Sequence, residues 1–192
     1  RSALQETLSQ LKDHPSALII SAAPVFGLKW IETLQHWASA WGFALAVDAE
    51  NWMAHGGTAR TLLNFLGASS QPITILSGDV HYSFAYDVVL RFRGGPRLWQ
   101  ITASGFKNAF PKTLLRQLAQ SNRWLYHPLS PLNLFTKRRK LWVQPRRVKD
   151  EAGQSVEALS HPGVGQVCFN AQGRPTRIAL FDAHRDFVFE EP

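Results

Sequence analysis

The sequence has almost no cysteine, and this excludes two ways of stabilising a fold. Of the 192 residues only Cys168 is a cysteine, so the chain contains neither an internal disulfide framework nor a zinc site built from several cysteines. Cys168 lies between Val167 and Phe169 in an apolar stretch, where a free thiol usually serves as a small core residue. We therefore assign Cys168 no chemical role.

Long hydrophobic runs and several well-known catalytic motifs are also absent. The longest apolar stretches, such as 17–25, have the length of a strand, whereas a membrane-spanning helix needs about 20 residues. Residues 1–13 are polar and lack the apolar region of a signal peptide, so we predict no membrane span and no secretory signal. No P-loop and no Gly-x-Ser-x-Gly turn occurs, which argues against nucleoside-triphosphatase and serine-hydrolase chemistry. These absences do not determine the cellular compartment.

Positive charge is in excess and is concentrated late in the chain. The net charge is +7, and much of it lies in the clusters 137–140 and 146–149. Such clusters can bind nucleic acid or anionic lipid, form a surface for an acidic partner, or simply make a solvated face. Neither cluster lies in a nucleic-acid-binding motif. Nucleic acid is therefore not expected as a partner, and a solvated face is the preferred interpretation.

The first part of the chain alternates predicted strands and helices. With 45% hydrophobic residues, a chain of this length suits one domain with a sizeable core. Continuous apolar runs predict strands covered on both faces, and apolar residues at helical spacing predict helices. The predicted strands are 17–21 and 72–76, and the predicted helices are 2–12, 28–41 and 58–66.

The later part of the chain consists mostly of predicted strands. These cover 84–92, 97–103, 165–170 and 177–182, with turn signals at Gly94-Gly95 and Gln172-Gly173. The segment 122–162 is basic, proline-rich and weakly periodic, which predicts an excursion, a lid or a flexible insert. The fold class is therefore α/β, a sandwich of two sheets with helices flanking the first, in a single domain over 1–192.

The tetrapeptide Gly78-Asp79-Val80-His81 is the most informative motif. It follows a predicted buried strand, and the carboxyl ends of such strands are where α/β sheets place ligands. Gly78 allows a sharp turn there. A carboxylate and an imidazole form a common ligand pair for iron, zinc or manganese, so Asp79 and His81 are candidate metal ligands. The alternative is a turn aspartate beside a hydrogen-bonded surface histidine.

The residues around this tetrapeptide resemble the PhoD-like alkaline phosphatases, within the calcineurin-like metallophosphoesterase superfamily. The segment 75–83, Ile-Leu-Ser-Gly-Asp-Val-His-Tyr-Ser, is similar to the strand and loop that carry metal ligands in that family. Further similar segments follow the family's order along 17–111 and 163–182: Asn51-Trp52, Arg60-Thr61-Leu62-Leu63, residues 98–105 with Asn108, Val164-Gly165-Gln166-Val167, and Gly173 with Arg177-Ile178-Ala179-Leu180.

This resemblance implies a fold, a reaction and a metal site. The implied fold is half of a four-layer αββα sandwich of mixed sheets with flanking helices. The implied function is that of a metal-dependent phosphatase or phosphodiesterase acting on a phosphoester. Asp79 and His81 would be metal ligands, with aspartate replacing the first histidine of the superfamily's Gly-His-x-His motif. Iron with calcium is the implied metal pair, and zinc or manganese are the alternatives.

The superfamily's earlier metal motifs are not found ahead of the tetrapeptide. Gly-Asp-x-x-Asp and Gly-Asn-His-Asp/Glu do not occur in the sequence, and no Asp-x-His triplet precedes residue 79, so the catalytic residues are unknown. The expectation is a C-terminal half that is inactive alone and holds metal weakly, since two protein ligands rarely organise a tight site. Its expected partner is a missing N-terminal half of the same protein. Self-association over an uncovered sheet face is the alternative.

Other residues are weaker candidates. Tyr82 and Ser83 are candidates for contact with substrate phosphate or a second metal, and the preferred alternative is that both only continue the strand. Arg60 is either a phosphate clamp or part of a structural ion pair, and we prefer the structural role. Trp52 is expected in the core or a pocket wall. Five other histidines lack a partner at ligand spacing: His14, His36, His127, His161 and His184.

A non-catalytic binding module is the alternative function. In that hypothesis the basic segment 122–150 contacts nucleic acid, lipid or protein. Binding to polyanions would then be sensitive to salt and independent of Asp79 and His81. It would be lost on charge reversal at four arginines: Arg138, Arg139, Arg146 and Arg147. A third possibility is a degenerate family member whose metal site no longer works.

Overall fold

The computed structural model of the chain describes most of the predicted elements. The described residues are 6, 9–11, 14–27, 52, 56–69, 71–90, 98–103, 111–125, 130–131 and 141–192. The helix predicted over 28–41, most of the helix predicted over 2–12 and the basic cluster 137–140 lie outside them. Within the described residues no helix is long and apolar enough to cross a membrane.

The first sheet is mixed and has five strands. These are β1 (Ala17–Ser21), β2 (Ile73–Ser77), β3 (Phe84–Leu90), β4 (Leu98–Thr102) and β5 (Leu141–Pro145), in the order β1-β2-β4-β3-β5. Strands β1, β2 and β4 run parallel, whereas β3 runs antiparallel to both β4 and β5. The carboxyl ends of the three parallel strands therefore meet at one edge of the sheet.

The second sheet also has five strands, all paired antiparallel. These are β6 (Arg147–Lys149), β7 (Ser155–Val156), β8 (Val164–Phe169), β9 (Pro175–Phe181) and β10 (Asp186–Glu190), in the order β7-β6-β10-β9-β8. A tight turn joins β8 to β9. The residue at the predicted turn signal there, Gly173, has a φ of 71°, a left-handed conformation that glycine adopts without steric cost.

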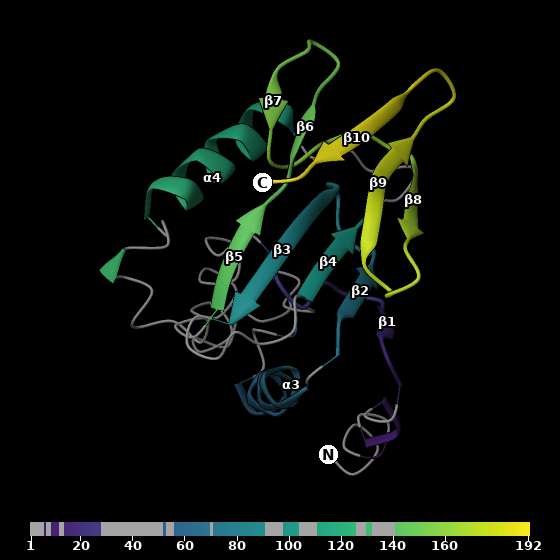
Figure 1. Cartoon of the computed structure of the whole chain (residues 1–192). Helices are drawn as coiled ribbons and strands as arrows, with labels where there is room; N and C mark the ends of the chain where they lie inside the picture. The colour runs from purple at the N-terminus through teal and green to yellow at the C-terminus, as the bar shows by residue number, and fades with distance from the viewer. Residues whose placement is uncertain are drawn as a thin grey trace.

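The first sheet contributes to two hydrophobic cores, one shared with helix α3 (Gly56–Ala68) and one shared with the second sheet, and Figure 1 shows where these elements lie. Helix α3 covers one face of the first sheet, where its Leu62 and Leu66 share a core with Ile73 and other sheet residues. The other face packs on the second sheet, in a core that contains Ile101 and Ile178. The prediction of a mixed α/β fold with two packed sheets is confirmed. A fourth layer is not among the described elements.

The segment 122–162 differs from the lid or insert that its sequence predicts. Helix α4 (Lys112–Leu125) extends into it, β5 pairs with β3, and β6 and β7 belong to the second sheet. Much of the segment thus contributes to both sheets. The sequence pattern does not reveal these strands, because β5 and β6 are short and are separated only by residue 146. Their stability comes from strands that are distant in the chain.

Arg146 between β5 and β6 is buried, with a side chain only 2% exposed. Its Nε and Nη2 donate to Oδ1 and Oδ2 of Asp87 at 2.7 and 3.2 Å. This two-point ion pair links β3 to the residue that joins β5 of the first sheet to β6 of the second sheet. The interpretation of the 146–149 cluster as a solvated face is therefore wrong for Arg146, although Arg147 is exposed.

Strand β1 lies at an edge of the first sheet. Its apolar run predicts a strand covered on both faces, yet Leu18 is 49% and Ile20 is 80% exposed. The prediction of full coverage is therefore wrong. Edge strands usually carry charge, proline or a bulge that prevents pairing with another chain, and β1 has the uncharged sequence Ala-Leu-Ile-Ile-Ser.

Candidate functional site

The loops that follow the three parallel strands are held together at the carboxyl edge of the first sheet. The amide of Gly78, just after β2, donates to the carbonyl of Ala22, just after β1, at 3.1 Å. The amide of Ala103, just after β4, donates to the carbonyl of Ser77 at the same distance. The hydroxyls of Ser77 and Thr102 lie 2.7 Å apart and share a hydrogen bond. These contacts provide a rigid base for the tetrapeptide 78–81.

The sharp turn of the tetrapeptide occurs at Asp79. Asp79 has a φ of 54° and is the only non-glycine with positive φ among the residues with described geometry. This conformation is sterically costly for most side chains, and aspartate is among the residues that tolerate it best. Gly78 has no positive φ, and a Cβ there would meet only the carbonyl of Ala103 at an ordinary 3.8 Å, so neither the turn nor the packing requires glycine at this position.

The two candidate metal ligands lie on this turn. The side chains of Asp79 and His81 are both exposed. Immediately afterwards the chain enters the core, because Ser83 and Leu159 form an isolated bridge in which each amide donates to the other's carbonyl at 2.8 Å. The turn is thus fixed at both ends, and it presents a carboxylate and an imidazole to solvent at the strand end.

Tyr82 belongs to the core. Its side chain is 5% exposed, and its ring stacks on that of Phe84 with centroids 5.5 Å apart. Ser83 is also buried, at 1% exposure. These positions favour the structural alternative for both residues over contact with substrate.

Arg60 and Trp52 occupy different ends of the first sheet. Arg60 is exposed on α3, a helix that lies in Figure 1 at the end where β2 begins, away from the tetrapeptide. Trp52 is partly buried and packs on the core. Its indole N–H donates to the hydroxyl of Ser21 at 2.9 Å. Trp52 therefore lies at the carboxyl end of β1 and packs against the core, one of the two places expected for it.

Among the described residues, this edge offers one pair of candidate metal-ligating side chains. No group of three or more His, Cys, Asp or Glu residues in the described part of the chain has the arrangement to hold a metal ion. Asp79 and His81 supply one oxygen donor group and one nitrogen donor, a combination that suits a transition metal. They fit part of a metal site.

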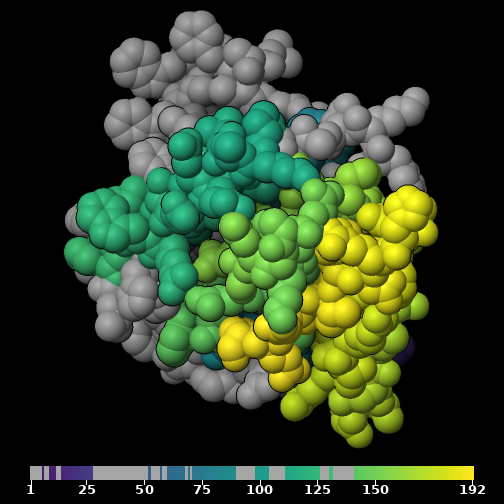
Figure 2. Space-filling model, turned by 90° about the horizontal axis from the view of Figure 1, so that it is seen from above, coloured from purple at the N-terminus to yellow at the C-terminus, as the bar shows by residue number. Residues whose placement is uncertain are grey.

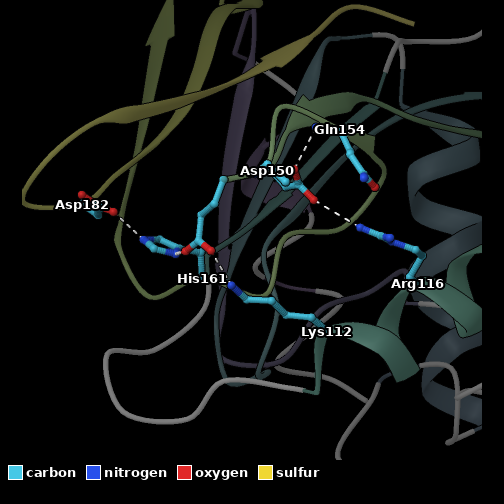
Figure 3. Close-up of polar contacts among 8 residues, drawn as sticks. Lys112, Arg116, Asp150, Gln154, His161 and Asp182 are labelled. Atoms are coloured by element: carbon cyan, nitrogen blue, oxygen red, sulfur yellow. Dashed lines mark hydrogen bonds and ion pairs between the residues drawn. The ribbon is translucent and has the colours of Figure 1, made fainter.

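A second polar cluster, invisible to sequence reasoning, surrounds His161 (Figure 3). The ring Nε2 lies 2.5 Å from Oδ2 of Asp182, and Nδ1 lies 2.8 Å from Oε1 of Glu151. Glu151 in turn pairs with Nζ of Lys112 at 2.5 Å. We call these four residues the His161 cluster. They come from α4, the turn between β6 and β7, the loop before β8 and the turn between β9 and β10.

Both carboxyls of the His161 cluster have pKa values below their ordinary values. The amide of His184 donates to Asp182, and together with His161 it lowers the pKa of that carboxyl. The hydrogen bond from Lys112 is the main cause of the lowered pKa of Glu151. Because both ring nitrogens are engaged, His161 ties three segments together and is not positioned as a metal ligand.

The segment that carries His161 borders the strand-end site. Leu159 bridges to Ser83 on one side. On the other side, a Cβ at Gly165 would lie 3.0 Å from the Cβ of Ala103, the residue that follows β4. Residues 159–165 therefore run along the same edge of the first sheet as the tetrapeptide, and only the folding of the two sheets brings them there.

Comparisons of the chain with models of protein families, with curated proteins and with solved structures found no match.

Proposed function

We propose that this chain is part of a metal-dependent phosphoester hydrolase in which Asp79 and His81 bind the metal. One observation carries the proposal: a carboxylate and an imidazole lie exposed on a turn at the carboxyl end of β2, and the backbone of Asp79 has the unfavourable φ of 54°. Strained backbone persists where surrounding contacts enforce it, and such residues concentrate at functional sites. The resemblance of 75–83 to the metal segment of PhoD-like phosphatases supports the same assignment.

A bound metal ion would polarise a phosphoryl oxygen and lower the pKa of a water molecule, which can then attack the phosphoester at neutral pH. The residues of this chain contribute the ligand pair and the base that holds it. The amide of Gly78 on the carbonyl of Ala22, and the bridge of Ser83 to Leu159, fix the turn from both sides. Iron with calcium is the proposed metal pair, with zinc or manganese as alternatives.

Further ligands and the catalytic acid would come from polypeptide outside these 192 residues. The described residues offer two ligands at the edge, and a catalytic metal needs at least three. The uncharged edge strand β1, with Ile20 80% exposed, has the composition of a strand in the middle of a parallel sheet. We therefore propose that a further strand pairs with β1 and that the completed sheet completes the metal site.

The test measures metal binding and hydrolysis separately. Binding of Mn²⁺ to the 192-residue chain is followed by electron paramagnetic resonance, and hydrolysis of p-nitrophenyl phosphate and bis(p-nitrophenyl) phosphate is followed in the complete protein. We expect Asp79→Asn and His81→Gln each to weaken Mn²⁺ binding by about tenfold or more, because each removes one of two ligands. We also expect both variants to abolish metal-dependent hydrolysis.

Matched controls are Asp186→Asn and His184→Gln. Both residues are exposed on the second sheet or its β9–β10 turn, and we expect wild-type binding and hydrolysis from both. Unchanged Mn²⁺ affinity or full hydrolytic activity in both site variants would reject the proposal.

A further inference from the structure

A cavity of about 450 Å³ lies between helix α4 and the segment 150–160. Its size falls in the range of small-molecule sites, which is about 300–1,000 Å³. Seen from above, α4 lies beside the strands that follow residue 141 (Figure 2). No residue of the tetrapeptide lines the cavity, although Ser160 belongs to the segment 159–165 that runs along the carboxyl edge, and Lys112 and Glu151 belong to the His161 cluster.

The cavity has an apolar part made by both of its walls. Leu115 and Ala119 come from α4, and Val156 and Ala158 come from the opposite segment. Leu115 and Ala158 are 3% and 8% exposed and belong to the main core. The apolar lining is therefore firmly placed and suits a short hydrocarbon group.

Two ion pairs close one side of the cavity (Figure 3). Nζ of Lys112 lies 2.5 Å from Oε2 of Glu151, and Nη2 of Arg116 lies 3.4 Å from Oδ2 of Asp150. Both join α4 to the turn between β6 and β7. These four charged groups already pair with one another, so they hold the two walls together. A ligand in the cavity would be bound by other residues of the lining.

Arg123 and Glu157 are the other charged groups of the lining. They attract each other electrostatically. Burial raises the pKa of the Glu157 carboxyl, and Arg123 and Arg147 oppose that shift. A partly buried carboxyl and an exposed guanidinium thus line one cavity, and neither has a hydrogen-bond or ion-pair partner among the described residues.

We propose that this cavity binds a small zwitterion, namely a free α-amino acid with an apolar side chain. Its carboxylate would pair with Arg123, its ammonium group with Glu157, and its side chain would lie over Leu115 and Ala158. The charges of the lining are balanced: Lys112, Arg116 and Arg123 face Asp150, Glu151 and Glu157. This balance disfavours a phosphate or a bare cation and matches a ligand that carries one charge of each sign. The inference is independent of the proposed hydrolase function.

The experiment titrates the ¹⁵N-labelled chain with L-leucine and follows amide chemical shifts. Two analogues each lack one charged group: L-leucinol has no carboxylate and 4-methylpentanoate has no ammonium. We expect saturable shifts with leucine at amides of α4 and of 150–160. We expect each analogue to bind about tenfold or more weakly, the loss expected for one charge-assisted hydrogen bond.

Two variants assign each charged group of the ligand to its partner. Arg123→Gln should remove the preference for leucine over leucinol, and Glu157→Gln should remove the preference for leucine over 4-methylpentanoate. The control Arg174→Gln, an exposed residue of the β8–β9 turn, should bind leucine as the wild type does. The proposal is overturned if leucine gives no saturable shift, or if both cavity variants keep the wild-type preferences. Mn²⁺ binding at Asp79 and His81 is unaffected by either result.

Discussion

At the scale of single residues, Arg146 shows how burial changes the role of a charged side chain. In the sequence it belongs to a basic cluster with Arg147 and Lys149. In the structure its guanidinium is withdrawn from water and forms a two-point ion pair with Asp87. A buried pair contributes little relative to an apolar pair, but the loss of one partner leaves the other charge uncompensated. Arg146 is thus unavailable for polyanion binding, which weakens the binding-module alternative.

We expect Arg146→Ala to lower the free energy of unfolding by about 3–5 kcal/mol, because the carboxylate of Asp87, only 20% exposed, loses its partner. Urea denaturation followed by circular dichroism measures the change. Arg147→Ala is the neighbouring control, and its exposed side chain should leave stability within about 0.5 kcal/mol of wild type. Equal effects of the two substitutions would contradict the buried ion pair.

Two carboxyls should affect the pH dependence of stability with opposite signs. The pKa of Asp182 is lowered, chiefly by the amide of His184, so its contribution is present at neutral pH and is lost as pH falls through its folded-state pKa. Burial raises the pKa of Glu157. The stability linked to Glu157 is therefore full below its unfolded-state pKa and is lost as pH rises through its folded-state pKa.

Denaturation of two variants between pH 3 and pH 8 would test these signs. We expect Asp182→Asn to be less stable than wild type at neutral pH, with a deficit that shrinks as the medium becomes acidic. We expect Glu157→Gln to gain stability relative to wild type as pH rises. A constant difference across the range, for either variant, would show that the carboxyl does not titrate differently in the folded state.

At the scale of secondary structure elements, replacing two different glycines by alanine should change the stability of the protein in opposite directions. A Cβ at Gly163, just before β8, would lie 2.5 Å from the carbonyl oxygen of Phe181 and 2.9 Å from Cγ of Leu180. Backbone atoms of a paired strand cannot give way, so the loop must shift. Gly67 lies inside α3, and a Cβ there would meet nothing within 4 Å.

We therefore expect Gly163→Ala to destabilise the protein by about 1–3 kcal/mol through overpacking. Gly67→Ala should stabilise it by about 0.5–1 kcal/mol, because alanine loses less backbone entropy in a helix. Thermal denaturation of both variants under one condition measures the two shifts. A rise in melting temperature for Gly163→Ala would show that the loop before β8 packs less tightly on β9.

At the scale of the whole molecule, the open edge at β1 should determine how the chain associates. The strand has no charged residue and exposes Leu18 and Ile20, and an edge without protective charges pairs readily with another strand. We expect the isolated 192-residue chain to self-associate with increasing concentration. Ile20→Lys should shift it toward the monomer while retaining its circular dichroism spectrum.

Sedimentation velocity over a range of concentrations measures this association. The matched control is Val188→Lys, which replaces a residue 42% exposed on β10, a strand with a neighbour on each side. It should leave the distribution as in wild type. If Ile20→Lys and Val188→Lys have the same effect, association depends on exposed apolar area in general and the edge of β1 has no special role.

The sequence by itself determined the elements whose stability is local or whose apolar pattern is unbroken. Continuous apolar runs located β1 and β2, helical spacing located α3, and the turn signal at Gly173 located the hairpin of β8 and β9. It also located the tetrapeptide 78–81 at a strand end. Each of these depends on neighbours within a few residues of the chain, and that information is present in any short window.

Only the tertiary structure decided the features that join distant segments. The strands β5 and β10 exist because they pair with β3 and β9, and Arg146 is buried because β3 supplies Asp87. The His161 cluster assembles side chains from α4 and three separate connections, and the left-handed turn at Asp79 follows from contacts on either side of the tetrapeptide. Pairing and burial are free energies shared between residues far apart in sequence, so no single segment contains them.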